Sequence, residues 1–138
     1  MNREVVLFYN DLLAAERAGV EVLSGLIRMT EIPDLKALMG RFLRDEGMNC
    51  QILATLIRNS GEEPWKKTGD FVEKVARLER MEDKISLLVK GQEWVARRIR
   101  KNRAIFTYGS EAIFMESIKI QHEENVDQLK RISGISKL

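Results

Sequence analysis

The stretch RFLRDEGMNCQIL, residues 41–53, has the apolar period of a helix, yet two polar side chains share its inward stripe. Phe42 and Leu53 belong to this stripe, and Glu46 and Asn49 lie between them at helical spacing. A solvated helix would turn an acid and an amide outward, because burying them unpaired costs several kcal/mol. We therefore interpret this stretch as one side of a buried polar site inside a helical fold.

The same apolar period predicts four long helices along the chain. Their expected ranges are about 2–29, 34–59, 81–103 and 110–132. The two prolines, Pro33 and Pro64, fall between these segments, and we expect Asp34 to be the N-cap of the second helix. The last six residues, SGISKL, are expected to fray.

The connections between the helices indicate how they are arranged. Short links join the first helix to the second and the third to the fourth, which favours two antiparallel hairpins. Residues 60–80 join the second helix to the third and contain a short helical piece that starts at Asp70. Such a segment is long enough to run the length of a bundle. The prediction is an all-α, antiparallel four-helix bundle in one domain, residues 1–138, with a long crossover at 60–80.

Length and composition exclude several classes of protein. The chain has 138 residues and is 44% hydrophobic, which is enough for one buried core. Its formal net charge of +2 gives no electrostatic reason to bind nucleic acid. Cys50 is the only cysteine, and no uncharged run approaches the roughly 18 residues that span a bilayer. We expect a cytoplasmic protein that binds neither nucleic acid nor membrane.

Two surface features bear on possible partners. The basic run ARRIRKNR, residues 96–103, ends a helix, where cations complement the helix dipole, so we interpret it as structural charge. Ile113 and Ile120 lie on the face of the fourth helix opposite its core stripe, and Trp94 lies off the stripe of the third. These apolar side chains either mark a homodimer face or pack under the crossover, and we expect a homodimer.

The other long helices also carry polar residues in the middle of their apolar stripes. Glu16 occupies this place in the first helix, Gln92 in the third, and His122 in the fourth, with Asn125 one turn further on. Lys119 precedes His122 by three residues, where its long stem could bring the ammonium to the same level. All lie near the middle of their helices, so we predict one polar layer halfway along the bundle.

This arrangement resembles the ferritin-like superfamily, and in particular the small bacterial ferritin-like or rubrerythrin-like domain proteins, over residues 2–132. In its di-iron members, the first and third helices each provide one Glu, and the second and fourth each provide Glu-x-x-His. The resemblance implies a matching position for each of these ligands. They are Glu16, the pair Glu46 and Asn49, Gln92, and the pair Lys119 and His122.

Three of these positions keep a residue type that the motif uses as a ligand, and they are the candidate metal ligands: Glu16, Glu46 and His122. Asn49, Gln92 and Lys119 replace the other ligands. Two carboxylates beside an ammonium carry too little negative charge for two divalent cations. We therefore do not expect a conventional di-iron carboxylate centre.

Two states of this layer remain open. In one, no metal binds, and Lys119 forms a buried ion pair with Glu16 or Glu46 while the amides and His122 complete the hydrogen bonds. In the other, Glu16, Glu46 and His122 hold a single Fe or Mn ion, and Lys119 turns aside or stays neutral. An ammonium within about 3 Å of either acid favours the first state. A Lys119 turned toward solvent leaves room for an ion.

Two functional hypotheses follow. The first is a structural or interaction module, built on a bundle whose di-metal site has degenerated. The alternative, which the resemblance implies, is a metal-binding, oxidoreductase-like protein that handles iron or peroxide. The sequence contains no Gly-rich phosphate loop, CxxC or HExxH motif, so we assign no catalytic residue and no organic cofactor.

Overall fold

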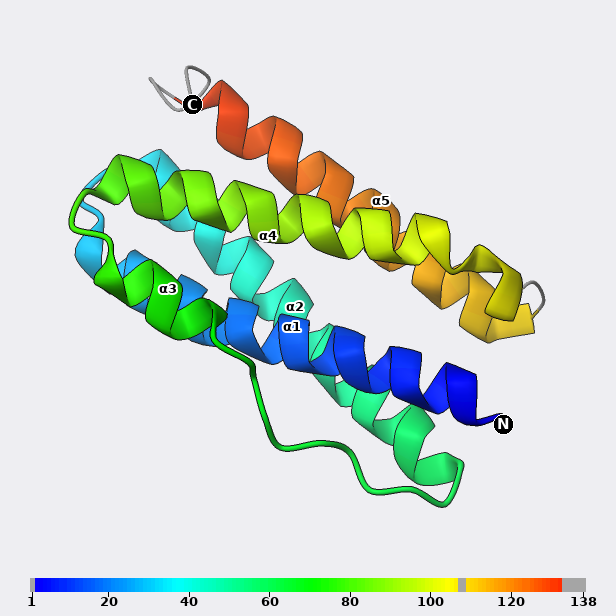
Figure 1. Cartoon of the computed structure of the whole chain (residues 1–138). Helices are drawn as coiled ribbons and strands as arrows, with labels where there is room; N and C mark the ends of the chain where they lie inside the picture. The colour runs from blue at the N-terminus through cyan, green and yellow to red at the C-terminus, as the bar shows by residue number, and fades with distance from the viewer. Residues whose placement is uncertain (1, 107–108, 133–138) are drawn as a thin grey trace.

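Two helical hairpins make up the structure, a computed structural model that describes residues 2–106 and 109–132 (Figure 1). The first hairpin pairs α1 (Arg3–Met29) with α2 (Pro33–Asn59). The second pairs α4 (Met81–Lys101) with α5 (Gly109–Arg131), with the 3-10 helix η1 (Arg103–Ile105) between them. Within the described residues every regular element is helical, which confirms the prediction of an all-α bundle.

A long crossover joins the two hairpins, as the sequence predicts. It runs back along α1 from the end of α2 and contains α3 (Phe71–Arg77), which begins directly after Asp70 (Figure 1). Two side chains of α1 hold it: Asn10 accepts a hydrogen bond from the backbone N–H of Trp65 at 2.9 Å, and Arg17 donates to the Trp65 carbonyl. The crossover is therefore fixed to α1 by two partly buried polar contacts.

The helix ends differ from the prediction in two places. The helix α2 begins at Pro33 with Ile32 as its N-cap, so the prediction that Asp34 caps this helix is wrong. Proline suits the first helical position because it lacks the N–H that would go unsatisfied there, and this moves Asp34 into the first turn. The helix α4 ends at Lys101, and η1 continues the chain where a longer helix was predicted. The segment SGISKL lies outside the described residues.

The core consists of two apolar clusters, one toward each end of the bundle. Every long helix contributes to both clusters and changes from one to the other near its middle. The change falls between Leu13 and Val22 in α1, Phe42 and Leu53 in α2, Val89 and Val95 in α4, and Ile118 and Val126 in α5. The predicted polar residues occupy these four gaps, so the fold places them at one level between two hydrophobic cores.

The surface carries exposed apolar side chains on α5 and a set of paired arginines. Ile113 and Ile120 of α5 are 72% and 46% exposed, so they do not pack beneath the crossover, and the homodimer stays a prediction. Three arginines of the basic run form ion pairs with carboxylates of α1 and α5: Arg98, Arg100 and Arg103. Among the described residues, no helix is sufficiently long and apolar to cross a membrane.

Candidate functional site

The predicted polar layer is buried and draws side chains from all four long helices. Its members are Glu16 from α1, Glu46 and Asn49 from α2, Gln92 from α4, and His122 and Asn125 from α5. Glu16 and Glu46 are each 1% exposed, and His122 is fully buried. Groups this polar are retained in a core only when they are hydrogen-bonded, ion-paired or metal-bound, so their contacts define what the layer can do.

Glu16 is the centre of one half of the layer. His122 Nε2 lies 2.9 Å from Glu16 Oε1, and Asn49 donates from Nδ2 to Glu16 Oε2 at 2.7 Å. The Asn49 amide also donates to Gln121 Oε1 at 2.8 Å. The two oxygens of Glu16 therefore have separate roles: one is held by an amide from α2, and the other faces the imidazole from α5.

Glu46 is the centre of the other half. Gln92 donates from Nε2 to Glu46 Oε2 at 2.9 Å, and Asn125 in turn donates to Gln92 Oε1 at 2.9 Å. The second oxygen, Oε1, lies against the backbone of α1 at Gly19, where any Cβ would overlap it. Glycine at position 19 is thus what allows a carboxylate from α2 to reach the centre of the bundle.

Glu16, Glu46 and His122, the predicted metal ligands, are brought together by the fold. Each offers one ligand atom, and these three atoms lie within 4.8 Å of one another. They come from α1, α2 and α5, so the cluster depends on the packing of both hairpins. Two carboxylates and one imidazole form a donor set that suits a single Fe(II) or Mn(II) ion.

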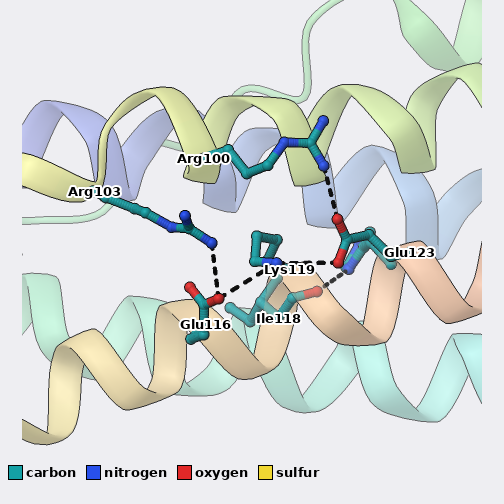
Figure 2. A network of polar contacts seen from close by, with 7 residues as sticks. Arg100, Arg103, Glu116, Ile118, Lys119 and Glu123 are labelled. Atoms are coloured by element: carbon teal, nitrogen blue, oxygen red, sulfur yellow. Dashed lines mark hydrogen bonds and ion pairs between the residues drawn. The ribbon is translucent and has the colours of Figure 1, made fainter.

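Of the two states that the sequence left open, the one in which Lys119 pairs with Glu16 or Glu46 is wrong. Lys119 Nζ lies 3.1 Å from Glu123 Oε1 and 3.3 Å from Glu116 Oε1, both on its own helix (Figure 2). Figure 2 shows Glu123 paired onward with Arg100 of α4, and Glu116 with Arg103 of η1. Lys119 is buried, at 8% exposed, but because it starts at the flank of the stripe, its stem carries the ammonium to partners at i−3 and i+4 instead of into the layer.

The tautomer of His122 follows from its contacts. Nδ1 lies 2.8 Å from the carbonyl oxygen of Ile118, which can only accept, so Nδ1 carries a proton. Nε2 faces Glu16, either as a second N–H donor of an imidazolium or as a lone pair directed at a shared cation. Metal-ligating histidines commonly donate their other ring N–H to a backbone carbonyl, and His122 has this arrangement.

Burial and the neighbouring charges shift the pKa values of Glu46 and His122. Burial raises the pKa of Glu46, and the charge of Glu16 raises it further, to about 8, although His122 and the Gln92 hydrogen bond act in the opposite direction. Burial lowers the pKa of His122, but the charge and hydrogen bond of Glu16 outweigh it and raise the pKa to about 9. Near neutral pH and without a metal, the layer therefore holds an imidazolium beside Glu16 and a protonated Glu46.

The interpretation of the sequence missed two contributors to this site. The first is Gln121, which accepts the second hydrogen bond of Asn49. Its position directly before His122 in the sequence could have indicated that it lies near the layer. Gly19 is the second, and it is the neighbour of Glu46. A glycine in the middle of a long helix, far from any turn, indicates a close approach by another group.

The fold and the site together define a helical bundle protein with a buried carboxylate and histidine cluster at its centre. The chain belongs to the family described as Domain of unknown function (DUF6306), which matches residues 3–131. No curated protein and no solved structure matches the chain. The family match covers all four long helices, and therefore every residue of the cluster.

Proposed function

We propose that this protein is a ferritin-like bundle that binds one divalent transition metal ion, Fe(II) or Mn(II), through Glu16, Glu46 and His122. The observation that carries this proposal is the approach of three ligand atoms from three helices to within 4.8 Å. The bond from His122 Nδ1 to Ile118 supports it, because it aims Nε2 at the two acids. Lys119 pairs with Glu116 and Glu123 of its own helix, which leaves this centre free of a competing ammonium.

Charge and hydrogen bonding favour one ion over two. Two carboxylates and a neutral imidazole balance a single divalent cation, whereas a second cation would leave an uncompensated charge of +2 in the core. Asn49 and Gln92 point their amide nitrogens at the carboxylates, so they orient the candidate ligands instead of supplying further ones. The site supports a mononuclear centre, and a di-iron centre is not proposed.

The role of such a centre rests on the resemblance to ferritin-like proteins. A bound iron or manganese ion would supply one-electron redox chemistry, of the kind used in handling iron or peroxide. This chain's own part is to hold the ligands: the amides fix one oxygen of each acid, and Ile118 fixes the imidazole. We propose a cytoplasmic setting, where Cys50, a free cysteine, stays reduced.

Metal analysis of purified protein tests the proposal. Protein from iron- and manganese-supplemented cultures is expected to contain close to one ion per chain, and Glu46→Gln is expected to lose it. Glu123→Gln is the matched control, because it removes an acid of α5 that lies outside the cluster. A metal-free wild type, or a variant at position 46 that keeps its metal, would overturn the metal assignment.

A second candidate function is a metal-free structural or interaction module, and one observation favours it. Asn49, Gln92, His122 and Asn125 each have a hydrogen-bond partner in the layer, so its side chains satisfy one another without an ion. With the His122 pKa at about 9, an imidazolium also balances Glu16 at neutral pH. The metal-free outcome of the same experiment would select this candidate.

A further inference from the structure

A cleft of about 460 Å³ opens between α1, α4 and the part of the crossover that leads into α3. It extends inward to the polar layer, where Glu16, Glu46 and Gln92 form part of its lining. Pockets that bind small molecules span roughly 300 to 1,000 Å³ and combine apolar walls with a few polar groups. The cleft has the size of such a pocket, and its walls and charges indicate what it would accept.

The wall on the α1 side consists of small residues. Ala14, Ala15, Ala18 and Gly19 line the cleft, all within the sequence AAERAG. Leucine or valine at these places would fill the space and pack α1 directly against α4. The sequence of α1 therefore creates the cavity, while Leu87, Leu88 and Val95 form the apolar wall on the α4 side.

The end of the cleft near α3 is closed by an aromatic ring. Phe71, at the start of α3, packs against Gly91 of α4 so closely that a Cβ on this glycine would lie 2.9 Å from the ring. Lys84 of α4 donates a hydrogen bond to the Val75 carbonyl at 2.9 Å, which ties α3 to α4. The crossover thus forms a fixed boundary of the cleft.

The charged groups of the rim do not balance. Asp11 pairs with Arg98 at 2.8 Å, and Asp70 pairs with Lys74 at 3.5 Å. Lys90 and Arg97 also line the cleft, and among the described residues neither has a carboxylate within salt-bridge distance. They lie two helical turns apart on α4, with the half-exposed Trp94 between them.

The floor of the cleft is acidic, in contrast to its rim. Its acids already have partners, since Glu16 binds Asn49 and His122, and Glu46 binds Gln92. A second anion placed there would be repelled by Glu16, whereas an anion at the rim would meet two unpaired cations. The unsatisfied charge of the cleft is therefore positive and lies at its mouth.

We propose that this cleft binds a small organic anion with an apolar body. Its carboxylate, or a comparable anionic group, lies at the rim between Lys90 and Arg97, and its apolar body lies between the alanine wall of α1 and the apolar wall of α4. The site does not depend on a metal ion at Glu16 and Glu46. A failure of the proposed function would therefore leave this proposal unaffected, and the reverse also holds.

Two probes with the same eight-carbon alkyl group test this site: sodium octanoate and octylamine. Trp65 and Trp94 are the two tryptophans, so a Trp65→Phe background leaves Trp94 at the rim as the sole fluorescent reporter. In metal-free protein, octanoate is expected to change the Trp94 emission saturably, with octylamine binding roughly tenfold more weakly. Octylamine binding as tightly as octanoate would overturn the proposal, because the floor acids would then be the anchor.

Variants separate the cleft from nonspecific binding. Reversing both rim charges, with Lys90→Glu and Arg97→Glu, is expected to weaken octanoate binding about tenfold, whereas Lys101→Glu on the same helix changes it less than about twofold. The side chains at 90 and 97 are exposed, so the fold is retained. Ala18→Leu fills the cleft and is expected to abolish binding while the helical circular dichroism persists. An octanoate affinity that is unchanged in the variant with both rim charges reversed would overturn the proposal.

Discussion

Helix α5 takes part in two charged clusters. Each pairs a basic side chain with glutamates, but the two clusters differ in how deeply they are buried. On its inner side, His122 meets Glu16, and both are buried to 1% exposure or less. One turn away, Lys119, whose side chain is 10% exposed, meets Glu123, whose side chain is 39% exposed. Breaking a buried pair costs about 3–5 kcal/mol, whereas exposed pairs contribute about 0–1 kcal/mol. Burial, and not the presence of opposite charges, decides which cluster matters to the protein.

One acid in each cluster has a shifted pKa, and the two shifts have opposite directions. Glu46 in the layer has its pKa raised to about 8, chiefly by burial. For Glu116 at the surface, slight burial acts to raise the pKa, but hydrogen bonds and charges from Lys119 and Arg103 outweigh it and hold the pKa below its usual value. The inner cluster therefore stores protons near neutral pH, which is where a bound cation would replace them.

The largest expected effect is a pH dependence confined to the inner cluster. The folded-state pKa exceeds the ordinary value for both groups, from 4.5 to about 8 for Glu46 and from 6.5 to about 9 for His122. The folded protein thus keeps protons that the unfolded chain has released, and stability falls as pH rises through these windows. Urea unfolding of metal-free protein is expected to show a loss on the order of 3 kcal/mol between about pH 6 and pH 8.5.

Adding a metal ion to the same unfolding experiment gives a second test of the inner cluster. Saturating Mn(II) binds the deprotonated ligands, so under anaerobic conditions it is expected to stabilise the protein more at the higher pH and to reverse the trend. Glu116, with its lowered pKa, does not titrate in this window, so it contributes nothing to the slope. A metal-free stability that stays flat or rises with pH would contradict the inner cluster described above.

A smaller effect is expected from Gly19→Ala, which disturbs the inner cluster without removing a charge. The new Cβ overlaps Glu46 Oε1, so the carboxylate must move away from its bond with Gln92. We expect a loss of about 1–3 kcal/mol in urea unfolding, together with loss of bound metal. Gly25→Ala is the matched control, because nothing lies within 4 Å of a Cβ there.

The control is expected to change stability in the opposite direction. Alanine is preferred over glycine inside a helix by about 0.5–1 kcal/mol, so Gly25→Ala should stabilise α1. If both variants stabilise the protein equally, the close approach of Glu46 to position 19 does not exist.

The sequence predicted the architecture and the layer because both depend on position along a helix. The apolar period places Glu16, Glu46 and His122 in mid-stripe, and a mid-stripe residue faces the core whatever its chemistry. Lys119 could not be placed in this way. It lies at the flank of the stripe, where the direction of its stem depends on which acids compete for the ammonium.

The distances between the helices also could not be predicted from the sequence pattern. The contact between Glu46 and Gly19 depends on how closely α1 and α2 approach, and the cleft depends on the space that Ala14 and Ala18 leave beside α4. Periodicity reports which face is buried but carries no measure of volume. Short side chains on a core stripe are therefore the feature of a sequence that most needs a structure for its interpretation.

The smallest expected effect belongs to Lys119→Met, which breaks the outer cluster. The Glu16 and Glu46 carboxylates do not contact this ammonium, so the large loss that a buried pair implies is not expected. Methionine keeps most of the apolar stem, and Glu116 and Glu123 retain Arg103 and Arg100 as partners (Figure 2). Urea unfolding is expected to change by less than about 1 kcal/mol, with the metal content unchanged. A loss of several kcal/mol would place the ammonium back among the buried acids and would remove the distinction between the two clusters.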